Sequence, residues 1–110
     1  MDFRNLKVLI IGDVMLDEYI QGSSDRVSPE APVPIVLVNE KTSALGGAAN
    51  VANNCASLGA SVMLIGITGE DSAGKEISLA LKTKKINYLG PIIKGVLTTK
   101  KVRILSRSQQ

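Results

Sequence analysis

A run of small residues from Gly46 to Gly69 constrains the fold of this 110-residue chain more than any other stretch. Two glycines open the run, so the backbone can turn sharply and approach a ligand where a Cβ atom would intrude. Four apolar residues then share one face at helical spacing: Val51, Ala52, Cys55 and Leu58. The apolar residues 61–67 follow between glycines and predict a strand. The run therefore predicts a glycine turn, a short helix and a strand in succession.

The glycine pair, Gly46 and Gly47, precedes the N-terminus of the predicted helix, where backbone N–H groups are free and the helix dipole is positive. Asn50 lies in the first turn and carries an amide donor and a carbonyl acceptor, which suits a pair of sugar hydroxyls. These features favour a polyhydroxylated or anionic ligand. A tight loop without a ligand explains the two glycines about equally well, because short glycine motifs are weak signals.

Residues 6–11 are apolar apart from Lys7, end at Gly12 and are typical of a buried parallel strand. Asp13 and Asp17 follow this strand. In open α/β sheets, ligands bind at the carboxyl ends of the strands. Each carboxylate could therefore accept hydrogen bonds from sugar hydroxyls, although a solvated loop position accounts for either residue as well.

The residues between this strand and the glycine turn predict a small β flap over the sheet edge. Residues 19–22 and 35–38 are typical of short strands, and three prolines within residues 29–34 exclude a helix between them. Such a flap has an exposed edge that needs a partner or a cover. After the glycine run, residues 73–84 predict a helix, and residues 87–93 predict a strand interrupted by Gly90 and Pro91.

Basic residues gather in the last third of the chain. Residues 77–110 carry eight bases and no acid, whereas residues 1–76 carry ten acids and five bases. On the alternating strand predicted over residues 98–106, three of the bases share one face: Lys101, Arg103 and Arg107. No aromatic residue follows Tyr88, so platforms for stacking nucleic-acid bases are missing and no nucleic-acid partner is expected. A phosphate on a small substrate and an acidic partner segment fit the charge about equally well.

The remaining composition excludes several classes of site. A single cysteine excludes an internal disulfide, and Cys55 is predicted to be a small buried hydrophobe. The absence of histidine excludes a His-based triad or a His-ligated metal within this sequence, and no metal site is expected. The sequence shows neither a signal-peptide pattern nor an apolar run of membrane-spanning length. We therefore expect a cytoplasmic protein without a membrane partner.

Taken together, these residues resemble the ribokinase-like (PfkB) family of carbohydrate kinases. The first signature of that family is matched in full by seven residues: Gly46, Gly47, Ala48, Asn50, Ala52, Gly59 and Gly69. Residues 69–74 also match its Gly-x-Asp-x-x-Gly turn. Within the family, residues 26–34 and 101–110 are similar to the kinases of D-glycero-β-D-manno-heptose 7-phosphate, often the N-terminal half of a bifunctional protein of ADP-heptose synthesis.

The resemblance implies an α/β fold: the N-terminal part of a Rossmann-like ribokinase fold with a small β lid. Residues 1–110 would then be a single incomplete domain, with lid segments at about 18–40 and 98–108. The resemblance further implies that five residues contact sugar hydroxyls: Asp13, Asp17, Gly46, Gly47 and Asn50. Lys101, Arg103 and Arg107 would meet the 7-phosphate.

The implied activity is ATP-dependent phosphorylation of the heptose 7-phosphate at O1, for the lipopolysaccharide core, with ATP and Mg²⁺ used by the full-length kinase. The family's second signature, a Gly-Ala-Gly-Asp anion hole and base, is absent from this sequence. No catalytic residue is therefore assigned, and this chain alone is expected to bind neither ATP nor Mg²⁺ and to be inactive. The alternatives are a non-catalytic sugar-phosphate-binding or dimerisation module and a basic module for a polyanion. We also expect a homo-oligomer, most simply a dimer, formed through lid strands or an exposed sheet edge.

Overall fold

The body of the protein is built on a three-stranded parallel sheet. The computed structural model describes residues 2–27 and 34–107, and there the body strands are β1 (Lys7–Ile11), β4 (Ser61–Ile65) and β6 (Asn87–Leu89), in the order β1-β4-β6. A two-stranded parallel ribbon of β5 (Thr68–Gly69) and β7 (Ile92–Ile93) lies beyond the ends of β4 and β6. Gly90 and Pro91 separate β6 from β7, as the sequence predicts.

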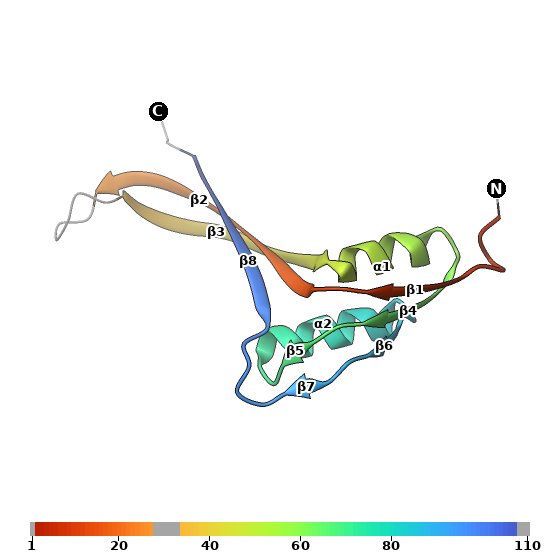
Figure 1. Ribbon diagram of the computed structural model, residues 1–110. Helices are drawn as coiled ribbons and strands as arrows, with labels where there is room; N and C mark the ends of the chain where they lie inside the picture. Colours follow the sequence, from red (N-terminus) through yellow and green to blue (C-terminus); the bar gives the residue numbers. More distant parts are fainter. Residues whose placement is uncertain (1, 28–33, 108–110) are drawn as a thin grey trace.

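A second sheet forms a lid that extends away from the body (Figure 1). Its central strand is β2 (Val14–Val27), which pairs antiparallel with β3 (Pro34–Gly47) and parallel with β8 (Thr99–Arg107). Strands β2 and β3 are far longer than the strands predicted over residues 19–22 and 35–38, because their pairing continues to the glycine turn at Gly46 and Gly47. Most of the proline-rich segment falls outside the described residues.

Two helices follow β3 and β5. Helix α1 (Ala48–Ser57) begins directly after the glycine turn, and α2 (Ser72–Thr83) begins after Asp71, within one residue of the predicted start. Neither helix of the described chain is long and apolar enough to cross a membrane.

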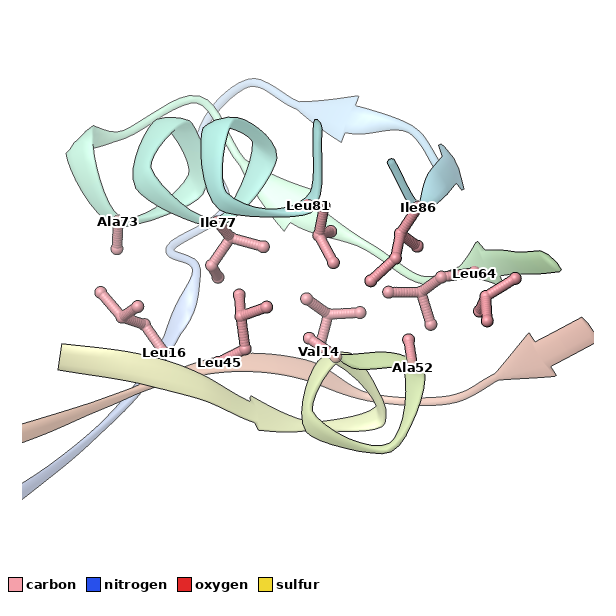
Figure 2. Packing of buried hydrophobic residues seen from close by; sticks show 11 residues of the cluster. Val14, Leu16, Leu45, Ala52, Leu64, Ala73, Ile77, Leu81 and Ile86 are labelled. Carbon is pink, nitrogen blue, oxygen red and sulfur yellow. The ribbon is translucent and has the colours of Figure 1, made fainter. Parts of the chain in front are cut away.

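The main core lies between α2 and the base of the lid. Ile77 and Leu81 of α2 are fully buried and face Leu16 of β2 and Leu45 of β3, with Leu64 of β4 beside them (Figure 2). The two helical residues are four positions apart, so they lie on one face of α2. The lid is thus attached to the body by apolar packing as well as by the chain connections.

Helix α1 buries only part of the face that the sequence predicts. Ala49 and Ala52 are fully buried, whereas Val51 and Leu58, which were expected on the apolar face, are exposed. Cys55 is half-buried against the core, consistent with a small hydrophobe. The alanine side chains let the helix backbone approach the sheet closely, so size rather than hydrophobicity decides which face packs.

One face of the body sheet is uncovered in the described residues. Val62 and Leu64 point to the buried face, but Leu9 and Ile11 are 56% and 70% exposed on the opposite face. Met63 of β4 and Leu89 of β6 belong to the same exposed face by their register with β1. Strand β1 is parallel as predicted, but the expectation that it is buried on both faces is wrong for this chain.

Asp71 and Thr98 connect α2 to the beginning of β8. Asp71 accepts hydrogen bonds from the Gly74 N–H at 2.9 Å, the Thr98 N–H at 2.8 Å and the Thr98 hydroxyl at 2.5 Å. The Gly69 N–H donates to the Thr98 hydroxyl at 2.8 Å. These bonds, the Thr98 hydroxyl foremost, lower the pKa of Asp71 below its usual 3.8. The Gly-x-Asp-x-x-Gly turn therefore caps α2 and anchors the third lid strand.

This network predicts a pH dependence of stability that Asp71→Asn should reduce. Because folding lowers the pKa of Asp71, its ionised form stabilises the fold above pH 3.8, and that contribution is lost as the pH falls through the lower folded-state pKa. We expect the melting temperature of the wild type to fall more steeply with pH in this range than that of Asp71→Asn. Circular-dichroism melts from pH 7 to pH 2 measure both slopes. Glu70→Gln, at an exposed neighbouring carboxylate, is the control, and equal slopes for wild type and Asp71→Asn contradict the prediction.

Candidate functional site

The turn at Gly46 and Gly47 ends the lid strand β3 and begins helix α1. Gly47 has φ 58° and ψ −134°, a conformation that is strained for any residue with a Cβ atom. The next residue, Ala48, donates its N–H to the carbonyl of Asp13 at 2.8 Å. The loop that follows β1 therefore holds the first residue of α1 in place through a backbone contact.

Gly46 leaves room for the side chain of Asp17. A Cβ atom built on Gly46 would lie 2.7 Å from Asp17 Cγ and 2.8 Å from Met15 Cγ, closer than real contacts allow. Asp17 is half-buried, and its Oδ1 is buried without a hydrogen-bond donor among the residues that the structure describes. A buried carboxylate oxygen without a donor is costly. Asp17 therefore presents an acceptor that a ligand hydroxyl could satisfy.

The N-terminus of α1 supplies donors beside this acceptor. No side chain of the described residues caps the helix, and its first turn carries no acidic residue. Asn50 is exposed in this first turn. Free N–H groups and the positive end of the helix dipole therefore lie directly after the glycine turn.

The predicted basic residues lie on β8, next to β2. Lys101 is in register with Asp17, Arg103 with Tyr19, and the backbone of Arg107 with Ser23. Because paired residues of neighbouring strands point to the same face, Lys101 and Arg103 share the face of Asp17. Both are exposed, and within the described part of the chain neither forms an ion pair with Asp17. Their charges remain available to a ligand on this face.

Asp13 differs from the other predicted residues. Its side chain is exposed in the loop between β1 and β2, and its contribution to the turn comes from its carbonyl oxygen. The structure thus brings Asp17, Gly46 and Gly47 together and places the cations of β8 on the same lid face. In residues 2–27 and 34–107, no group of three or more acidic or cysteine side chains is arranged to hold a metal ion.

The sequence reasoning missed a charged cluster on the opposite lid face. Glu18 forms ion pairs with Lys41 of β3 and Lys100 of β8, beside a cavity of about 290 Å³. Ser43 donates a hydrogen bond to Glu76 of α2 at the same cavity. Strand alternation could have revealed Glu18, because it falls on the apolar face between Leu16 and Ile20.

Comparison with known proteins identifies relatives over nearly the whole chain. Residues 5–110 match the family described as pfkB family carbohydrate kinase. The chain is 50% identical over 109 residues to "Bifunctional protein HldE" of Haemophilus influenzae strain Rd, and 50% identical over 105 residues to the protein of that name of Helicobacter pylori strain J99. The two matches include 99% and 94% of this chain, respectively, but only 23% of the length of either relative.

Solved structures of carbohydrate kinases share the fold. A carbohydrate kinase of Agrobacterium tumefaciens superposes with a TM-score of 0.69 at 20% identity, covering 93% of this chain and 32% of that one. Ribokinase of Cryptococcus neoformans in complex with ADP gives a TM-score of 0.64 at 27% identity, covering 89% and 30%. Phosphofructokinase-2 of Escherichia coli gives 0.67 at 20% identity, covering 90% and 30%. The mixed α/β architecture is thus that of ribokinase-like kinases, as the sequence predicts.

Substitution of Gly47 tests how strictly the site turn requires glycine. Gly47→Ala should lower the free energy of unfolding by about 2 kcal/mol or more, because it adds backbone strain to a clash with the Asp13 carbonyl. Gly95→Ala is the matched control, since Gly95 also has a positive φ, of 84°, but its Cβ would meet nothing within 4 Å. Urea denaturation measures both. Equal costs at the two positions would show that the contact with Asp13 does not matter.

Proposed function

Because this chain belongs to the pfkB family of carbohydrate kinases, we propose that it forms the sugar-binding portion of an ATP-dependent kinase. The proposed acceptor is D-glycero-β-D-manno-heptose 7-phosphate, phosphorylated at O1 in the synthesis of ADP-heptose for the lipopolysaccharide core. The observation that carries this proposal is the buried Oδ1 of Asp17, which packs against Gly46 and has no donor within residues 2–27 and 34–107. A sugar hydroxyl is a donor of the size and polarity that this oxygen lacks.

The other predicted residues have complementary roles in this proposal. The N–H groups after Gly47 and the side chain of Asn50 would bind neighbouring hydroxyls at the N-terminus of α1. The exposed cations Lys101 and Arg103 would meet the 7-phosphate from β8, and Arg107 continues the same strand. The sugar would thus lie between the glycine turn and the lid.

Sequence similarity, rather than the geometry around Asp17, supports the choice of a heptose as the sugar. Residues 26–34 and 101–110 resemble heptose 7-phosphate kinases, and relatives named "Bifunctional protein HldE" are 50% identical over this region. The lid cations favour a substrate that already carries a phosphate. An unphosphorylated sugar would leave them without a partner.

The nucleotide is assigned to the rest of the kinase. ATP would supply the phosphoryl group, and Mg²⁺ would neutralise its charge. The Gly-Ala-Gly-Asp run that carries the anion hole and the base in the family is absent from these 110 residues, so we assign neither nucleotide contacts nor a general base here. This chain would orient the acceptor sugar and, alone, would not transfer phosphate.

A second candidate function is a non-catalytic module that binds sugar phosphate or dimerises. The uncovered apolar face of the body sheet favours it, since a free-standing chain must cover Leu9 and Ile11. The two proposed functions predict different activities of the natural protein: the kinase would transfer phosphate from ATP to the sugar. The module would bind without any ATP turnover.

Calorimetric titration with heptose 7-phosphate, combined with an ATP-consumption assay, tests the proposed function. We expect this chain to bind the sugar phosphate without turnover, and Asp17→Asn to weaken binding about tenfold or more, because the amide replaces an acceptor oxygen with a donor. Asp2→Asn, at an exposed carboxylate paired with Arg4, is the control and should bind as the wild type does. Turnover by this chain would contradict the proposal that the general base and the ATP site lie outside these 110 residues. Binding that is insensitive to Asp17→Asn would contradict the proposed site.

We also propose that the chain forms a dimer or a larger homo-oligomer. The candidate contacts are the uncovered sheet face around Ile11 and the exposed apolar residues Val102 and Ile104 of the lid edge strand β8. Light scattering at micromolar concentration should show more than one copy. Ile11→Asp and Ile104→Asp then distinguish the two surfaces, because a charge at the contact disfavours association. A monodisperse wild-type monomer would rule out this proposal.

A further inference from the structure

Glu18 is a charged residue buried on the lid face opposite to Asp17. Its side chain is only 7% exposed, with Oε1 2.6 Å from Nζ of Lys41 and Oε2 3.2 Å from Nζ of Lys100. Each carboxylate oxygen is therefore paired with a lysine from a different neighbouring strand. A carboxylate buried to this extent needs such partners, because removing its hydration costs several kcal/mol.

The two ion pairs cross the lid sheet diagonally in opposite directions. Lys41 is in register with Ile20 on β2, and Lys100 is in register with Leu16, two residues on either side of Glu18. Because side chains alternate between faces, a slip of β8 by one residue would turn Lys100 to the other face and break its ion pair. The same slip would turn Lys101 away from Asp17.

Apolar burial does not fix the register of β8. Val102 and Ile104 on one face and Leu105 on the other are all about half exposed. A strand that buries neither face specifies its register weakly. Thr98 anchors the point where the strand begins, through Asp71, and Lys100 is the first strand residue with a described side-chain partner in the lid. The ion pair of Lys100 with Glu18 therefore specifies the register of β8, which apolar packing leaves undetermined.

We infer that Glu18 is a positioning residue, which holds β8 in the register that places Lys101 and Arg103 on the face of Asp17. By strand alternation Glu18 lies on the opposite face from Asp17, so it acts on that face only through the strand. The role of Glu18 in setting the register of β8 follows from the ion pairs and does not depend on the proposed function. Its consequence for the sugar phosphate rests on the proposed function.

Glu18→Gln tests the inference, because it removes the charge and keeps the shape of the side chain. Hydrogen exchange of the amides of residues 99–107 should accelerate about tenfold or more, while the amides of β4 exchange as in the wild type. Nuclear Overhauser contacts between residues 18 and 102, which are in register on β2 and β8, should weaken or disappear. The dissociation constant for heptose 7-phosphate should rise about tenfold, with little change for the unphosphorylated heptose.

Lys100→Met provides a milder variant in case Glu18→Gln does not fold. It should loosen β8 in the same direction, and the double variant should be little worse than the more affected single variant, because both changes break the same pair. Glu70→Gln is the matched control for loss of a carboxylate charge, since Glu70 is exposed and far along the chain from the lid.

The outcomes separate this inference from the proposed function. Wild-type exchange and contacts of β8 in Glu18→Gln would overturn the inference, and so would an equal loss of affinity for the two sugars. If the wild-type chain binds neither sugar, the proposed site fails for this chain. The exchange of β8 then decides the role of Glu18 by itself.

Discussion

The close approach of backbone at Gly46 and Gly47 is the constraint on which the rest of this structure depends. It ends β3, begins α1 and joins both to the loop after β1 through the Ala48 to Asp13 hydrogen bond. It also leaves the space that the Asp17 carboxylate occupies. Because a side chain at either glycine would collide with these neighbours, the fold and the candidate site depend on the same two positions.

Much of the architecture could be predicted from the sequence, because its signals are local. Apolar runs, prolines and glycines located the strands and both helices, and alternation placed Lys101 and Arg103 on one face of β8. The lengths of β2 and β3 were underestimated, because pairing between strands extends them through polar residues such as Glu40 and Lys41. Such pairing depends on a partner that is distant in the chain.

The contacts that hold the lid were harder to predict. Thr98 meets Asp71 across 27 positions, and nothing near Thr98 in the sequence indicates that partner. The buried face of α1 was predicted only in part: Ala52 is buried as expected, but Ala49 was left out, and Val51 and Leu58 are exposed. In the candidate site, residue types indicated the chemistry of Asp17, but only the structure shows that its Oδ1 lacks a donor in the described part of the chain.

Strand alternation divides the lid between two tasks. Leu16 and Glu18 face α2 or the neighbouring lysines and hold the sheet to itself and to the body, while Asp17 and its neighbours on the other face remain open to a ligand. Since the two sets alternate along β2, they cannot be shifted independently. A shift of the register by one residue would therefore exchange the face that carries Leu16 and Glu18 with the face that carries Asp17.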